Sequence, residues 1–513
     1  MERFLQQHRD QVIGVLSGFD RLVFRGSLRS ISYVKGLDVF LSSQHVLYKD
    51  FGGWAQGLSE RLKQHAQALA AQAGRPFQYV ASARVSKEDL ARRLLAAAPL
   101  DQGLIGVFSC VEPCQSFELR RDRQARRLVL VPAIRKCLFL YFYFLDREFG
   151  LIYVRLQTWL PFAIQVGLNG REYLARQMDR LGIGYQQRDN CFTQIDDLPR
   201  AQKLLDRLTT RRWPAVLNAL ARRLNPLLRR SSGLNLFGYY WSVRQSEYAT
   251  DLMFRSAADL QAVYPRLIDH AIRHFGSEDV LRFLGRRTNT RFNGEVKSEL
   301  RRRDEGVRIK HWVEENSLKM YDKQGSILRI ETTLNNPRRF KVRRVTARHG
   351  RRHKHWLPLR KGVADMTRRV EICRAANERY LEALAVVGRS APVPDLLDPI
   401  SHRITRDGRP YRGLRPITPE ESGLFAVLLR GEFRLQGFRN RDLRRRLEPA
   451  APPDPVRRRQ ASGRITRLLR LLRAHGLIRK VPHTLYYRLT QKGETVMSAA
   501  QNIRQADAAA LAA

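Results

Sequence analysis

The strongest constraint on the fold is a series of β-type segments between residues 103 and 170. The runs LIGVFSCVEP, RLVLVPAI, KCLFLYFYFLD, GLIYVRLQTWL and FAIQVGLNG follow one another with only short turns between them. Strands joined by short turns pair antiparallel with their neighbours, so the series predicts an antiparallel meander. Residues 138–145 are apolar at both alternating sets of positions, which predicts a central strand buried on both faces.

The segments around this meander predict a mixture of strands and helices. Two β-type runs flank Gly18-Phe19-Asp20 and predict a hairpin near the start of the chain. Apolar residues at helical spacing predict one helix that ends at Gly74 and another that ends at Gly182. We therefore expect residues 1–198 to form a mixed α/β domain with an antiparallel meander, and residues 199–390 to form a helical and β-hairpin region.

Composition indicates the partner more than the fold. The chain has 513 residues, of which 43% are hydrophobic, so it can build several cores. Lys and Arg number 93 against 49 Asp and Glu, and the formal net charge is +44. Such a surface attracts polyanions, and we expect DNA, with RNA as a further candidate. A membrane surface, or an excess of arginine from a GC-rich genome or a thermophile, is the alternative explanation.

Other features of the sequence predict a cytoplasmic protein. The most apolar run, KCLFLYFYFLDREFG, is too short to span a bilayer, and the N-terminal residues lack a signal-peptide core. The five cysteines are irregularly spaced, which argues against a disulfide framework. Cys110 and Cys114 are expected to be core thiols, with half of a metal site as the alternative.

A change of composition after residue 390 predicts a separate C-terminal domain. Residues 391–417 are rich in Pro, Gly and charge and are expected to be a linker. Residues 418–497 contain three helical patterns and then a β-hairpin pattern, and residues 498–513 are expected to be a tail. The stretch RLLRLLRAHGLIRKVPHTLYYRLTQKG resembles the recognition helix and wing of winged-helix DNA-binding domains.

The winged-helix resemblance implies contacts with duplex DNA. The cations expected to make them lie in and just before the third helical pattern: Arg457, Arg458, Arg459, Arg464 and Arg467. A winged helix that contacts protein or RNA is the alternative.

A second candidate site lies on the hairpin predicted by SLKMYDKQGSILRIETTLNNP, residues 317–337. Strand pairing across the Gln-Gly turn can bring Tyr321 or Asp322 beside Glu331. A carboxylate that holds a divalent cation and a tyrosine that attacks phosphorus suit phosphodiester chemistry. Ordinary cross-strand ion pairs are the competing explanation.

The order RFLGRR (282–287), KMYDK (319–323) and LRIE (328–331) resembles the replication initiators of plasmids and filamentous phage. The resemblance implies that a tyrosine nicks one DNA strand with Mg²⁺ or Mn²⁺. Glu331 and Asp322 would then be metal ligands, with Tyr321 as the catalytic candidate. Phe283 stands where some members carry a tyrosine. HKH, residues 353–355, is expected to be part of a basic loop.

The hairpin is followed by a basic run. Residues 337–361 contain 11 cations and no Asp or Glu, which predicts a track for nucleic-acid phosphates instead of an ordinary solvated face. The residues expected to contact phosphate are Arg338, Arg339, Lys341, Arg343, Arg344, Arg351, Arg352 and Lys354.

The sequence thus predicts an α+β protein with antiparallel sheets in its N-terminal and central regions, helical insertions and a C-terminal winged helix. One hypothesis is a mobile-element or replication-initiator protein that binds duplex DNA and cuts or joins a single strand. The other is a non-enzymatic regulator or RNA-associated factor. A third possibility is an RNase H-like two-metal site formed by Asp20, Glu112 and Asp146.

Overall fold

The computed structural model describes two compact units. The described residues are 1–124, 126–286, 294–303, 306–348, 351–385, 387, 393–447 and 454–506. One unit comprises Met1–Gly14, Leu252–Ile330 and Arg374–Ala513, and the other comprises Val15–Asp251 and Glu331–Cys373. We call them unit 1 and unit 2. This division differs from the boundaries expected after residues 198 and 390, because strands far apart in the sequence pair with one another.

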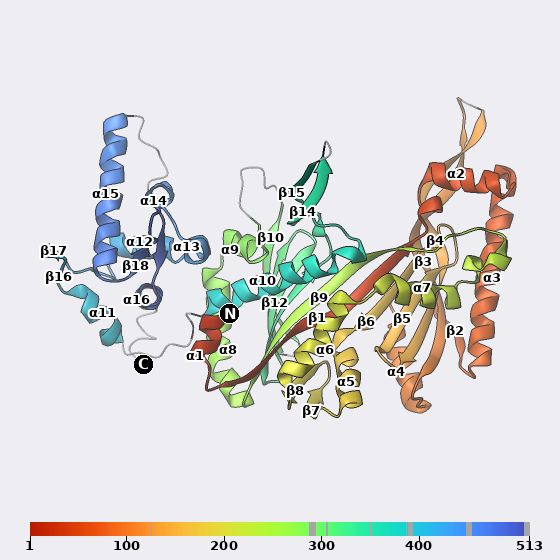
Figure 1. Cartoon of the computed structure of the whole chain (residues 1–513), viewed down its shortest axis with the longest axis horizontal. Helices are drawn as coiled ribbons and strands as arrows, with labels where there is room; N and C mark the ends of the chain where they lie inside the picture. The colour runs from red at the N-terminus through yellow and green to blue at the C-terminus, as the bar shows by residue number, and fades with distance from the viewer. Residues whose placement is uncertain are drawn as a thin grey trace. The chain divides into compact units, whose positions relative to one another are not determined.

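Unit 2 contains the predicted meander (Figure 1). Its strands lie in the order β13-β9-β1-β6-β5-β4-β3-β2. Strands β3 to β6 pair antiparallel in sequence order, which confirms the meander, whereas β2 pairs parallel with β3. The bounds are β1 Val12–Ser27, β2 Phe77–Tyr79, β3 Gly103–Asp122, β4 Arg127–Asp146, β5 Gly150–Gln157, β6 Ile164–Asn169, β9 Tyr240–Phe254 and β13 Ile327–Leu334.

Two segments are longer strands than we expected. The runs RLVLVPAI and KCLFLYFYFLD form one strand, β4, because β3 offers a pairing partner along its whole length. The hairpin predicted around Gly18 is wrong, since residues 12–27 form the single strand β1. At Gly18 helix α6, Leu198–Thr210, packs closely on β1: a Cβ there would lie 2.3 Å from Leu205 Cδ2.

Helices pack on the meander through buried apolar contacts. Trp213, at the start of α7, lies with its ring centroid 4.6 Å from that of Phe24 on β1. Ala91 of α4 packs in an apolar cluster with Phe108 and Tyr143 of the sheet. The helices of this unit are α2 Val34–Ser43, α3 Phe51–Gln72, α4 Lys87–Ala97, α5 Gly170–Leu181, α6 and α7 Trp213–Leu224. The short hairpins are β7 Tyr185–Arg188 with β8 Cys191–Ile195, and β14 Lys341–Arg348 with β15 Arg351–Pro358.

The predicted helix that ends at Gly182 is confirmed as α5, and its start matters for the site. The Asn169 side chain accepts hydrogen bonds from the backbone N–H groups of Arg171 and Glu172, which caps the helix. Gly182 adopts the left-handed conformation that ends it. The cap fixes Arg171 in the first turn of α5, directly after strand β6.

Unit 1 contains strands β10 Val296–Arg303, β11 Gly306–Val313 and β12 Asn316–Lys323, which pair antiparallel in sequence order. The hairpin predicted at residues 317–337 is confirmed as β12 followed by β13. Gln324 and Gly325, in the turn between these strands, both have positive φ, of 55° and 77°, as the central residues of a type I′ turn do. The helices are α1 Glu2–Gln7, α8 Ala257–His274, α9 Ser277–Phe283 and the second half of α10 Met366–Leu384.

The C-terminal part of unit 1 has its own apolar core, around Phe425, Ile465 and Leu472. Leu397, Ile400 and Leu414 belong to this core, so part of the segment expected to be a linker is folded. Residues 391 and 392 lie outside the described residues. The elements are α11 Val393–Ser401, β16 Ile404–Arg406, β17 Arg409–Tyr411, α12 Pro419–Leu428, α13 Gly431–Gln436, α14 Asn440–Leu447, α15 Pro455–Ala474, β18 Ile478–Lys480, β19 Tyr487–Leu489 and α16 Gln491–Gln505. Helix α16 extends into the expected tail.

The remaining expectations on cysteines and membranes concern both units. All five cysteines are buried and free, as expected for core thiols. Among the described residues, none of the helices combines the length and apolar character that crossing a bilayer requires.

We predict that Gly170→Ala destabilises the protein by about 2–3 kcal/mol, because the new Cβ would overlap a backbone atom. A Cβ at this position would lie 1.8 Å from the Phe19 carbonyl oxygen. Urea unfolding followed by circular dichroism measures the change. The matched control is Gly57→Ala in α3, where a Cβ meets no atom within 4 Å among the described residues; it should stabilise the protein by about 0.5–1 kcal/mol. Equal stability of the two variants would contradict the prediction.

Candidate metal centre

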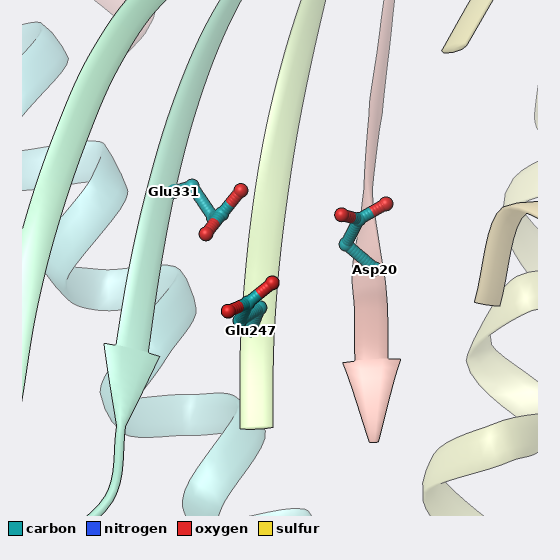
Figure 2. Close-up of side chains that lie close together, drawn as sticks. All are labelled: Asp20, Glu247 and Glu331. Atoms are coloured by element: carbon teal, nitrogen blue, oxygen red, sulfur yellow. The ribbon is translucent and has the colours of Figure 1, made fainter. Parts of the chain in front are cut away.

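Three carboxylates from distant parts of the sequence meet in unit 2. Asp20 lies on β1, Glu247 on β9 and Glu331 on β13, and these strands are neighbours in the sheet. One oxygen of each carboxylate lies within 4.8 Å of the others. Figure 2 shows the three side chains on their adjacent strands. Asp20 and Glu331 are only 6% and 1% exposed, whereas Glu247 is half-buried. We call these three residues the acid cluster.

Such a cluster is electrostatically costly unless positive charge is near. At 4.8 Å and an effective dielectric constant of about 20, each pair of carboxylates repels by on the order of 3 kcal/mol. Burial adds a desolvation cost for each charge. Oxygen ligands at this density are what Mg²⁺, Mn²⁺ and Ca²⁺ require. The donor set therefore fits a hard divalent cation.

Asp20 is oriented by two neighbours. Asn190, immediately before β8, donates a hydrogen bond from Nδ2 to Asp20 Oδ1 over 2.7 Å. The fully buried Arg171 places Nε 4.0 Å from the same oxygen and donates from Nη2 to Asp251 Oδ2 over 2.8 Å. Within the described part of the chain, Nε and Nη1 of Arg171 have no hydrogen-bond partner. This guanidinium thus brings positive charge beside the acid cluster and retains donors for a further oxygen.

Glu247 also has polar neighbours. Gln245, two residues earlier on β9, donates a hydrogen bond from Nε2 to Glu247 Oε1 over 2.9 Å. Burial lowers the pKa of Arg21, but the carboxylates of Glu247 and Glu88 raise it, and the net shift is upward. Arg21 therefore stays protonated and reduces the negative charge around Glu247.

Only one of the residues predicted on the β12–β13 hairpin belongs to the acid cluster. Glu331 belongs to it, whereas Asp322 and Tyr321 lie on β12 in unit 1. Asp322 accepts a hydrogen bond from Gln261 over 2.7 Å, and burial raises its pKa. Tyr321 is buried and pairs in register with Arg308. The catalytic role predicted for Tyr321 remains a prediction, and the metal role predicted for Asp322 is the alternative that the variant Asp322→Asn tests below.

Of the acids predicted for an RNase H-like site, only one belongs to the acid cluster as well. Asp20 lies in the acid cluster, but Glu112 bonds to Arg155 and to the Tyr141 hydroxyl, each over 2.6 Å. Asp146 accepts hydrogen bonds from the backbone of the turn that follows it. Sequence reasoning missed Glu247 and Arg171. The signal for Glu247 was present, since it is an acid in the middle of a β-type run, as Glu331 is.

The predicted phosphate contacts fall into three groups. Arg338 and Arg339 are exposed in the short 3₁₀ helix Pro337–Arg339. The second group lies on β14 and β15, where Arg344 is half-buried and paired with Asp365 while the others described are exposed: Lys341, Arg343, Arg352 and Lys354. The third group lies on α15 and is exposed: Arg457, Arg459, Arg464 and Arg467. The structure does not describe the side chains of Arg351 and Arg458. Arg287, the last residue of the RFLGRR motif, lies outside the described residues altogether.

Two of these placements differ from the expectation. Residues 353–355 lie on strand β15, not in a loop. Arg457 and Arg459 lie inside α15, because the helix begins at Pro455 under an Asp454 cap. Comparisons with known proteins add no further assignment, since no family model, curated protein or solved structure matches the chain.

We predict that Mn²⁺ binds the protein and raises its melting temperature, because a bound cation relieves repulsion within the acid cluster. Glu331→Gln should weaken Mn²⁺ binding at least tenfold. Without metal, it should leave the melting temperature unchanged or raise it, since one repelling charge is gone. Isothermal titration calorimetry and thermal melts measure the two effects.

The matched control is Asp322→Asn, which removes a buried acid from β12 outside the acid cluster and should leave Mn²⁺ affinity within about twofold of wild type. A loss of affinity in Asp322→Asn as large as that in Glu331→Gln would contradict the acid-cluster site and support Asp322 as a metal ligand. A wild-type protein that binds no Mn²⁺ would also contradict the prediction.

Proposed function

We propose that this chain is a nucleic-acid-acting enzyme that cuts or joins a phosphodiester strand with a divalent cation, Mg²⁺ or Mn²⁺. The observation that carries the proposal is the acid cluster of Asp20, Glu247 and Glu331, with oxygens within 4.8 Å of one another. The formal net charge of +44 supports a polyanionic substrate. A neutral small molecule would not need that charge.

The residues of the acid cluster have separable roles in this proposal. The three carboxylates would hold the cation, and Asn190 fixes the orientation of Asp20. A cation at such a site polarises a phosphoryl oxygen and lowers the pKa of a bound water. Arg171, anchored on Asp251, balances the charge of Asp20 and keeps the acid cluster from being uniformly negative.

The replication-initiator version of the proposal adds a tyrosine nucleophile, for which Tyr321 is the candidate. Attack by a phenolate on phosphorus forms a phosphotyrosine bond and releases a 3′-hydroxyl end, so the protein stays attached to the strand. Attack by water leaves no adduct. The two versions therefore differ in a product that can be isolated.

The experiment is a cleavage assay on labelled single-stranded DNA, supercoiled plasmid and RNA with Mg²⁺ or Mn²⁺. Wild type should cleave at least one of them, and Glu331→Gln should lower the rate at least 100-fold, because loss of one ligand removes the cation. In EDTA, the affinity of Glu331→Gln for the same nucleic acids should differ less than twofold from that of wild type. Asp322→Asn is the control and should keep its activity.

The outcomes separate the alternatives. An adduct formed by wild type and absent in Tyr321→Phe supports the replication-initiator version, and cleavage without an adduct supports attack by water. Metal binding without cleavage of any substrate would leave the non-enzymatic nucleic-acid-binding protein as the better account.

A second candidate activity is duplex DNA binding by a winged helix at the C-terminal end. It is supported by the order α12, α14, α15 and then β18–β19, with a backbone bridge from Phe438 to Tyr487 that adds a third strand position. The exposed side of α15 carries arginines, and Arg479 and Lys480 on β18 are exposed as well. A basic helix and a basic hairpin suit a major groove and its flanking phosphates.

We predict that a fragment of residues 393–506 melts cooperatively and binds duplex DNA, because its elements share one apolar core. A shorter fragment of residues 418–497 should melt at a lower temperature, since it lacks the core residues Leu397, Ile400 and Leu414. Differential scanning calorimetry and fluorescence anisotropy measure the two properties.

The control variant is Arg464→Gln with Arg467→Gln in the longer fragment. It should weaken DNA binding and lower the salt slope by about 2, at roughly 0.9 for each lost phosphate contact, without changing the melt. Identical melts of the two fragments would show that residues 393–417 are a linker after all.

A further inference from the structure

The β14–β15 hairpin of unit 2, labelled in Figure 1, has two faces that carry different side chains. Its strands pair antiparallel, with Arg343 opposite Trp356 and Val345 opposite Lys354. Residues opposite each other share a face, and the faces alternate along each strand. One face therefore carries seven described side chains, which we call the outer face: Lys341, Arg343, Val345, Arg352, Lys354, Trp356 and Pro358.

Every side chain of the outer face is exposed, and none is acidic. The opposite face is packed only in part: Val342 is buried and the half-buried Arg344 pairs with Asp365, whereas His353 and His355 are exposed. Trp356 is 60% exposed and Val345 is 55% exposed. A large indole left in water among four cations is unusual for a face without a partner.

The chemistry of the outer face selects the partner. The Arg343 guanidinium carbon lies 5.5 Å from the centroid of the Trp356 ring, so cation and aromatic form one unit. Unpaired nucleotides offer a π face to an indole and a phosphate to a neighbouring cation. In a duplex the base faces are already stacked on one another, so the indole has no surface to cover there. An apolar protein partner would not need the cations.

A cavity of about 620 Å³ adjoins the hairpin and extends the basic surface. Arg343, Lys354 and Arg360 are among its lining residues. Its two carboxylates are engaged, because Asp365 pairs with Arg344 and Glu371 pairs with Arg368. The cavity is large enough for a ligand of small-molecule size, such as a nucleotide unit.

We propose that the β14–β15 hairpin binds single-stranded nucleic acid, with one unpaired base stacked on Trp356 and the flanking phosphates held by Arg343, Arg352 and Lys354. The inference rests on the proposed function, because it specifies that the nucleic-acid substrate of the proposed enzyme is single-stranded. It concerns affinity without a metal, so it fails or succeeds independently of the cleavage test.

The experiment measures anisotropy of the full chain with fluorescein-labelled dT20, rU20 and a dA20·dT20 duplex in EDTA. Trp356→Ala should weaken binding to dT20 about tenfold, in line with the loss of one stacked base, and change duplex binding less than twofold. The slope of log affinity against log salt should stay constant, because no charge is removed. Lys354→Gln should instead reduce that slope by about 0.7.

Substitutions of the same residue separate stacking from packing. Trp356→Phe should keep most of the affinity for dT20, whereas Trp356→Leu, which keeps apolar volume without a ring, should lose as much as Trp356→Ala. The matched control is Tyr79→Ala, which removes a 57% exposed aromatic from β2 of the same unit and should change nothing. If Trp356→Ala loses as much affinity for rU20 as for dT20, the hairpin binds unpaired nucleotides with either sugar.

Two results would overturn the inference. One is unchanged dT20 affinity in Trp356→Leu and Trp356→Ala. The other is an equal loss on dT20 and on the duplex, which would mean that the hairpin enters a groove of paired DNA.

Discussion

Mutual repulsion among three carboxylates is the constraint around which unit 2 is arranged. Glu247 lies on the strand between those of Asp20 and Glu331, so pairing of β13, β9 and β1 brings the three acids into one place. The sheet tolerates this because helix α5 directs the Arg171 guanidinium toward Asp20 and Asp251, and because Asn190 donates to Asp20. Sheet pairing, the Asn169 cap of α5 and the β7–β8 turn all contribute to that one compensation.

The acid cluster contrasts with the charge of the rest of the chain. A protein of net charge +44 attracts phosphates over a wide surface, but three carboxylates repel a phosphodiester at the point where they lie. A cation between acids and phosphate reverses that repulsion. In the proposed function, substrate approach at this site would therefore depend on a metal, whereas affinity elsewhere would depend on arginine and lysine. For this reason the proposed catalytic and binding functions can be separated by mutation.

Sequence patterns located several elements well, and the reason is that these elements are local. The antiparallel meander, helix α5 with Gly182 and the Gln324-Gly325 hairpin depend on periodicity and on turn residues a few positions apart. The hairpin expected around Gly18 was wrong. Gly18 lies inside strand β1, at a point where Leu205 of the distant helix α6 packs closely against the strand. The composition of residues 391–417 also did not reveal that Leu397, Ile400 and Leu414 are part of a core, because their partners in that core lie in later helices.

The sequence by itself determined the charge, the strand and helix types, and the presence of acids at mid-strand, since each follows from neighbouring residues. It singled out Glu331 but paired it with Tyr321 and Asp322, the acid and tyrosine nearest along the chain. Only the tertiary structure decided that the neighbours of Glu331 are Glu247 and Asp20. The physical reason is strand order: β13, β9 and β1 are adjacent in the sheet although other strands and helices separate them in sequence, and no local pattern encodes which strands pair.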